Sequence, residues 1–153
     1  MSNALPFPCL DVAVCLIRSP HHVLAAYNLQ WETFTLPMTK RRRWQDPDVP
    51  IRFREEEWVD AAARAAAEWL GRTLRPSPLF LLDVAEYQQS DRAGLWQRYH
   101  FQVFSVTLEA EPAVVPGKIV EWLRPDDFLD DERRPISSTA RDLSRLLRAE
   151  GKV

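Results

Sequence analysis

The stretch EEEWVDAAARAAAEWLG, residues 55–71, decides the fold of this chain. Its opening glutamates favour the positive end of a helix. Alanine, the strongest helix former, fills six of the seven positions from 61 to 67. Gly71 follows the last apolar residues and can take the left-handed conformation that ends a helix. The pattern predicts a helix that begins among the glutamates and ends at Gly71.

The predicted helix has two distinct faces. Positions spaced i, i+4, i+7 and i+11 form an apolar stripe of Trp58, Ala62, Ala65 and Trp69. Positions at steps of four form a charged stripe of Glu56, Asp60, Arg64 and Glu68. The charged stripe is either a ladder of exposed ion pairs, each worth roughly 0.3–0.5 kcal/mol, or, at Glu68, a position with a chemical role. The two tryptophans either pack on a sheet or stack on a ligand.

Apolar and alternating runs on both sides of this helix predict strands. DVAVCLIRS, residues 11–19, is apolar at both sets of alternating positions, as expected for a central strand covered on two sides. Further strands are predicted at 22–28, 31–37, 79–87, 95–109 and 118–124, with 79–87 buried and a turn at 88–94. A second helix is predicted at 137–151, capped by Ser137 or Ser138. This order predicts an α/β fold with a mixed sheet between helices.

The segment RRRWQDPDVPIRFR, residues 41–54, interrupts this pattern. Its two prolines, acidic residues and basic cluster exclude a regular helix or a central strand, so it is interpreted as a loop or an insertion. The basic run Lys40, Arg41, Arg42 and Arg43 is either a solvated loop or a phosphate-binding patch.

Composition limits the class of protein. A length of 153 residues fits one domain, and a net charge of −2 excludes a basic footprint over the whole molecule of the kind that general nucleic-acid binding needs. No apolar run approaches the roughly 20 residues of a membrane span. The N-terminus lacks the pattern of a secretory signal, so a cytoplasmic location is expected. Cys9 and Cys15 have no metal-site spacing and are expected to be reduced residues in or near the core.

The order of elements and the first helix resemble the Nudix hydrolase family. Its signature is G-x5-E-x7-R-E-U-x-E-E-x-G-U, where U is apolar, on a loop, a helix and a loop. Four residues of this chain match that spacing: Glu56, Arg64, Glu68 and Gly71. LPMTK, residues 36–40, resembles the family's LPGGK segment, and EWLRPDDF resembles its late strand and turn. The resemblance implies a single α/β/α sandwich over residues 1–153 with an insertion at about 41–54.

The chain departs from the family at the positions that bind metal. In the family, helix carboxylates bind Mg²⁺ or Mn²⁺ for attack on a nucleoside diphosphate linked to another group. Here Ala65 and Trp69 stand where two of the three helix glutamates belong. Glu68 alone would hold a hard divalent cation weakly, because such ions need several oxygen ligands. Arg64 is expected to neutralise that carboxylate further.

Three functions follow from this comparison. The first is a family member with a degenerate metal site that binds a nucleotide-like or other phosphorylated small molecule, or a protein partner, without efficient hydrolysis. Its ligand-binding residues are expected to be Lys40, Arg41, Arg42, Arg43 and Trp69. Its residual catalytic positions are Glu68, Glu56 and Arg64.

The alternatives use other residues. An active pyrophosphohydrolase acting on a nucleoside diphosphate derivative would need Mg²⁺ or Mn²⁺, with Glu55, Glu56 or Glu57 and Glu86 joining Glu68. A pure interaction module would use the insertion and its Trp44 as the contact surface. The fold does not choose among these functions, because function belongs to the site. The sequence leaves the oligomeric state open.

Overall fold

The structure is a computed structural model that describes residues 9–49, 51–89 and 96–153. The N-terminal segment expected to lack a signal and most of the turn predicted at 88–94 lie outside these residues. The strands are β1 Cys9–Arg18, β2 Val23–Asn28, β3 Thr33–Thr35, β4 Met38–Lys40, β5 Arg43–Gln45, β6 Phe53–Glu55, β7 Leu82–Gln89, β8 Trp96–Thr107 and β9 Val120–Leu123. The helices are α1 Trp58–Leu70, the 3-10 helix η1 Pro125–Phe128 and α2 Ser138–Ala149.

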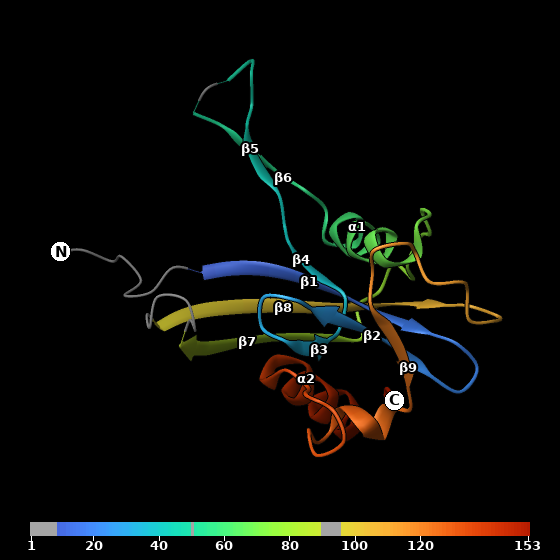
Figure 1. Cartoon of the computed structure of the whole chain (residues 1–153). Helices are drawn as coiled ribbons and strands as arrows, with labels where there is room; N and C mark the ends of the chain where they lie inside the picture. Colours follow the sequence, from blue (N-terminus) through green and yellow to red (C-terminus); the bar gives the residue numbers. More distant parts are fainter. Residues whose placement is uncertain (1–8, 50, 90–95) are drawn as a thin grey trace.

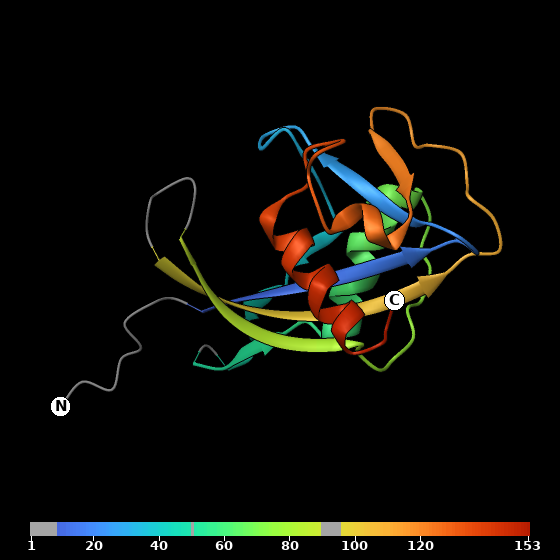
Figure 2. The same cartoon turned by 90° about the horizontal axis from the view of Figure 1, so that it is seen from below.

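A mixed sheet forms the middle layer of the molecule. Its strand order is β3-β2-β1-β8-β7, with β4 added beside β1 and β9 beside β2. β1 runs parallel to β8 from Cys9 opposite Arg98 to Arg18 opposite Thr107, whereas the other pairs are antiparallel. α1 lies on one face of this sheet and α2 on the other (Figures 1 and 2). The predicted α/β/α sandwich with a mixed sheet is confirmed.

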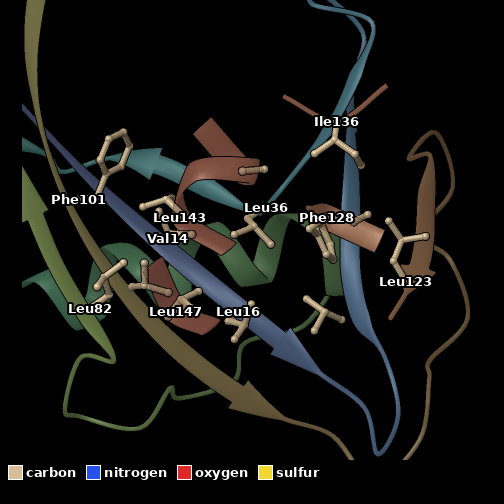
Figure 3. Close-up of a cluster of buried hydrophobic side chains, with 14 of the residues drawn as sticks. Val14, Leu16, Leu36, Leu82, Phe101, Leu123, Phe128, Ile136, Leu143 and Leu147 are labelled. Carbon is tan, nitrogen blue, oxygen red and sulfur yellow. The ribbon is translucent and has the colours of Figure 1, made fainter. Parts of the chain in front are cut away.

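The central strand β1 supplies both hydrophobic cores. Val12, Val14 and Leu16 join the core on the α2 side, which Figure 3 shows with Leu36, Phe128, Leu143 and Leu147. Ala13, Cys15 and Ile17 join the core on the α1 side. Burial raises the pKa of the Cys15 thiol to about 12. Both cysteines are free, but Cys9 at the start of β1 is exposed and not in or near the core as expected. The two-sided apolar pattern of β1 therefore reflects burial on two sides, as predicted.

The alanines explain how closely α1 approaches the sheet. Its buried residues are Ala61, Ala62, Ala65, Ala66 and Leu70. These short side chains let the helix backbone lie against β1. Gly71 ends the helix with φ 68°, and a Cβ there would lie 3.0 Å from Val115 Cγ2. Glycine is therefore required by its backbone conformation and by the contact with the segment before β9.

The structure corrects two sequence expectations near the ends of elements. The helix begins at Trp58, so Glu55 belongs to β6 and Glu56 precedes the helix. The strand predicted as buried over 79–87 is an edge strand that begins at Leu82, and Leu79 is 79 % exposed. Pairing decides both differences, because Glu55 lies opposite Arg43 in a hairpin and Leu82 lies opposite Val103.

The insertion forms a hairpin of its own. β5 and β6 pair antiparallel in a separate two-stranded sheet, which projects away from the body of the molecule (Figure 1). The exclusion of a helix or central strand at 41–54 holds, but the segment is more regular than a loop. The second helix begins as predicted, with Ser137 accepting a hydrogen bond from the Ala140 N–H. No helix in the described residues is long and apolar enough to cross a bilayer.

Candidate functional site

Arg64 ties α1 to the chain that precedes it. Its guanidinium donates to both carboxylate oxygens of Glu56, at 3.0 and 2.9 Å, to Thr39 Oγ1 at 3.1 Å and to the Lys40 carbonyl at 2.9 Å. The Glu56 side chain is only 11 % exposed. We call this group the Arg64 clamp. It fixes the helix to β4 and to the base of the hairpin, so Arg64 and Glu56 are engaged in holding structure.

The clamp shifts the pKa values of both Glu56 and Arg64. Hydrogen bonding from Arg64 holds the pKa of Glu56 below its ordinary value, although burial opposes this shift and the Arg42 N–H adds to it. The same hydrogen bond raises the pKa of Arg64. Because the folded pKa of Glu56 lies below the unfolded one, ionised Glu56 stabilises the fold at neutral pH.

This shift predicts a pH dependence of stability. The contribution of Glu56 is present above its unfolded pKa of about 4.3 and is lost as the pH falls through the folded pKa. Urea unfolding should therefore be measured at several pH values from neutral down to below about 4.3. As the pH falls, the free energy of unfolding should decrease less for Glu56→Gln than for the wild type. Glu57→Gln is the control, because Glu57 makes no side-chain capping bond. Equal slopes for wild type and Glu56→Gln would contradict the assignment.

Glu68 and Trp69 together hold a lysine from a distant segment. Lys118 Nζ lies 3.0 Å from Glu68 Oε1 and 4.7 Å from the centroid of the Trp69 ring. Lys118 precedes β9, in the same segment that packs Val115 against Gly71. Trp69 is partly buried and also packs against the α1-side core. We call this arrangement the Lys118 cation site.

The ion pairs around α1 differ from a ladder along the helix. Arg64 pairs with Glu56, which lies outside the helix, and Glu68 pairs with Lys118. Asp60 makes no ion pair with any residue that the structure describes. Arg64 interacts electrostatically with Glu68, as expected, but its hydrogen bonds belong to the clamp and the ion pair of Glu68 is with Lys118.

Arg41 anchors the hairpin. Its Nε donates to the Glu56 carbonyl at 2.5 Å, and Nη1 lies 3.2 Å from Asp11 Oδ2 and 3.1 Å from Glu55 Oε2. Its guanidinium also lies 5.1 Å from the centroid of the Trp58 ring. These contacts leave Arg41 partly buried at the hairpin base.

The rest of the basic run stays exposed but does not share one surface with Arg41. Lys40, Arg42 and Arg43 are exposed. Thr39 faces α1 through the clamp, so strand alternation directs Lys40 to the opposite face of the sheet. The structure thus divides the predicted phosphate-binding patch.

Solved structures share this architecture. The MutT protein from Methanosarcina mazei Go1 superposes with a TM-score of 0.68 at 19% sequence identity, over 98% of this chain and 100% of that chain. This chain has the Nudix fold. The NUDIX domain of Shewanella oneidensis NrtR complexed with ADP ribose gives a TM-score of 0.60 at 15% identity, over 96% and 93% of the two chains. The C-terminal domain of mouse MUTYH, solved in complex with human PCNA, gives a TM-score of 0.54 at 16% sequence identity, over 93% of this chain and 89% of that chain.

The comparisons by sequence find no relative. No protein-family model matches this sequence, and no curated protein matches it. The shared architecture therefore identifies the fold, and the chemistry has to be argued from the residues of this chain.

The carboxylates that could replace the missing Nudix ligands do not converge on Glu68. Glu55 contacts Arg41, and Glu56 belongs to the Arg64 clamp. Glu86 shares a face of β7 with Leu82, which packs on the α2 side, so Glu86 does not face α1 and cannot join Glu68 there. In the described parts of the chain, no three His, Cys, Asp or Glu side chains are arranged to hold a metal ion. The residues present do not fit the Mg²⁺ or Mn²⁺ that the fold family implies.

A polar cluster on the α1 face of the sheet was not identified from the sequence. His100 Nε2 lies 2.8 Å from Asp83 Oδ1, and His100 Nδ1 lies 3.7 Å from Asp11 Oδ1. Gln102 donates to the other oxygen of Asp83 at 2.9 Å, and the Trp58 ring meets the imidazole edge to face at 4.9 Å. These residues come from β1, β7, β8 and α1, so no local motif joins them.

Proposed function

We propose that this Nudix-fold protein binds a phosphorylated, nucleotide-like small molecule without efficient metal-dependent hydrolysis. The Lys118 cation site carries the proposal. At the two adjacent helix positions where the Nudix signature places paired glutamates, this chain has Glu68 and Trp69, and the ammonium of Lys118 contacts both.

A lysine supplies charge there but not the chemistry of a divalent ion. An ammonium has three donors and no acceptor, so one hydrogen bond to Glu68 leaves donors for phosphate oxygens. Lysine binds phosphate as a point charge. It cannot coordinate a water and lower the pKa of that water, which is how a bound metal generates a nucleophile. This site would therefore favour binding over hydrolysis.

The contact between Lys118 and Glu68 can open for a ligand at small cost. Both side chains are partly solvent-exposed, and exposed pairs of this kind contribute only about 0.2–1 kcal/mol to stability. The Trp69 ring beneath the ammonium is held against the core. A phosphate could thus bind to Lys118 with little rearrangement of α1.

ADP-ribose is a suitable probe, because the NUDIX domain of NrtR was solved in complex with it. In isothermal titration calorimetry with EDTA present, wild type should bind ADP-ribose. Lys118→Met should weaken this binding at least tenfold, or about 1.4 kcal/mol. Lys40→Met is the matched control, because Lys40 is exposed but lies on the other face of the sheet.

The two lysines separate the possible outcomes. A loss confined to Lys118→Met supports the Lys118 cation site. A loss with Lys40→Met and none with Lys118→Met would move phosphate binding to the basic run at 40–43. Equal affinity in all three proteins, or no binding by wild type, would overturn the proposal.

A further inference from the structure

We propose that the β5–β6 hairpin is a binding surface for single-stranded nucleic acid. It lies apart from the Lys118 cation site and is independent of the proposed small-molecule binding. The residues that carry it are Arg42, Arg43, Trp44, Arg52, Phe53 and Arg54.

The hairpin presents an aromatic ring on each of its two faces. Trp44 lies opposite Arg54, and Gln45 lies opposite Phe53. Residues paired across an antiparallel ladder share a face, and neighbouring pairs alternate, so Trp44 and Phe53 point to opposite faces. Trp44 is 47 % exposed and Phe53 is 53 % exposed. By contrast, Trp58 and Trp69 pack against the core beneath α1.

Each exposed ring has an arginine on its own face. The Arg43 guanidinium lies 4.5 Å from the centroid of the Phe53 ring. Arg54 is the cross-strand partner of Trp44. Each face of the hairpin therefore carries one exposed ring beside one guanidinium group.

The charge of the hairpin is local, and two of its four exposed arginines have no ion-pair partner within the described ranges. Arg42 and Arg52 are exposed, and their side chains make no ion pair with any residue in the described ranges. Arg43 lies 3.9 Å from the nearest Glu55 oxygen, and Arg54 lies 3.5 Å from Asp46. The whole chain has a net charge of −2, so the residues outside this projecting, net basic element are acidic on balance.

The base of the hairpin is held firmly. Arg41 joins β1, β6 and Trp58, and the Arg64 clamp joins α1 to Glu56 directly after β6. These contacts tie the base of the hairpin to the body, from which the hairpin projects (Figure 1). Such preorganisation reduces the ordering cost of binding.

This chemistry favours a single nucleic-acid strand. Proteins that bind single strands without sequence preference stack bases on aromatic rings and contact phosphates with basic side chains. In a duplex the bases are stacked within the helix and unavailable to Trp44 or Phe53. An acidic protein segment would pair with the arginines, but its carboxylates would not stack on the rings as bases do. Because the rest of the chain is not basic, we expect contact with only a few nucleotides.

The test is fluorescence anisotropy with labelled oligothymidine of about ten nucleotides, within the range that single-strand binding modules cover. Wild type should bind in low salt, and the affinity should fall as salt rises. Trp44→Ala with Phe53→Ala should weaken binding at least tenfold, and Arg42→Ala with Arg52→Ala should weaken it and reduce its salt dependence. The matched controls are Phe80→Ala with Trp96→Ala and Arg72→Ala with Arg75→Ala, which change exposed residues elsewhere.

Two further probes test whether stacking is involved. An abasic strand of the same length should bind at least tenfold more weakly, and polyglutamate should compete poorly. No binding of oligothymidine in low salt, or equal losses in the control variants, would overturn the proposal. Equal binding of the abasic strand or polyglutamate would also overturn it, because charge alone would then account for binding and an acidic protein segment would fit the surface. Circular dichroism and thermal melting should show that all variants remain folded.

The same variants distinguish this proposal from small-molecule binding. Lys118→Met should leave oligothymidine binding unchanged, because Lys118 contacts Glu68 and Trp69 on α1. Trp44→Ala with Phe53→Ala should leave ADP-ribose binding unchanged. Failure of one proposal therefore does not imply failure of the other.

Discussion

Replacing Ala65 by glutamate should lower the free energy of unfolding by about 2–4 kcal/mol. Ala65 is 1 % exposed and lies on the buried side of α1. A glutamate there would bring a carboxylate and two methylenes into space that an alanine fills, which adds a desolvation cost to overpacking. Restoring the family residue at this position therefore conflicts with the packing of this helix.

Urea unfolding of Ala65→Glu and Ala63→Glu provides the comparison. Ala63 is on the same helix but is only half-buried, so a glutamate there can reach water. We expect Ala63→Glu to lower the free energy of unfolding much less than Ala65→Glu does. The opposite result would be an Ala65→Glu variant that is as stable as wild type and whose melting temperature rises with Mg²⁺. That result would show that the helix can still hold a metal.

Arg64→Ala should be the second strongly destabilising change, with a loss of about 2–3 kcal/mol. Removing one partner of a buried ion pair costs roughly 3–5 kcal/mol, because the other charge stays buried without compensation. The figure is reduced here because Arg64 itself is partly exposed. Glu56, by contrast, would keep its burial and lose both hydrogen bonds from the guanidinium.

Two variants separate the Arg64 clamp from a general effect of charge. Arg72→Ala removes an exposed arginine just beyond α1 and should change stability little. Arg64→Lys keeps the charge but loses the planar fork that contacts Glu56, Thr39 and Lys40, so it should recover only part of the stability. Equal losses for Arg72→Ala and Arg64→Ala in chemical denaturation would contradict the clamp.

Local patterns in the sequence predict most of the fold. The alanine-rich helix, its end at Gly71 and the two-sided burial of β1 each depend on residues close in sequence, so periodicity and capping rules apply. The beginning of α1 is less predictable. Glu55 has a good helix propensity, but tertiary pairing opposite Arg43 places it in β6.

The candidate site depends on contacts between distant segments. The sequence singles out Glu68 and Trp69 by their spacing, but Lys118 lies fifty residues from Glu68 in a segment without periodicity. Asp83 and His100 likewise meet only because β7 pairs with β8. The basic run at 40–43 is visible in the sequence, yet strand alternation and the contacts of Arg41 decide which of its side chains are exposed. Such groupings follow from strand order, which a single sequence does not show.

The most direct test of the central claim is incubation of the protein with ADP-ribose and Mg²⁺, followed by chromatography of the nucleotides. Affinity is measured in parallel with Mg²⁺ and with EDTA. We predict that ADP-ribose is recovered intact and that its affinity is the same in both conditions, because Lys118 supplies the charge at Glu68 and Trp69. Cleavage of ADP-ribose that requires Mg²⁺ and is lost in Glu68→Gln would contradict the account.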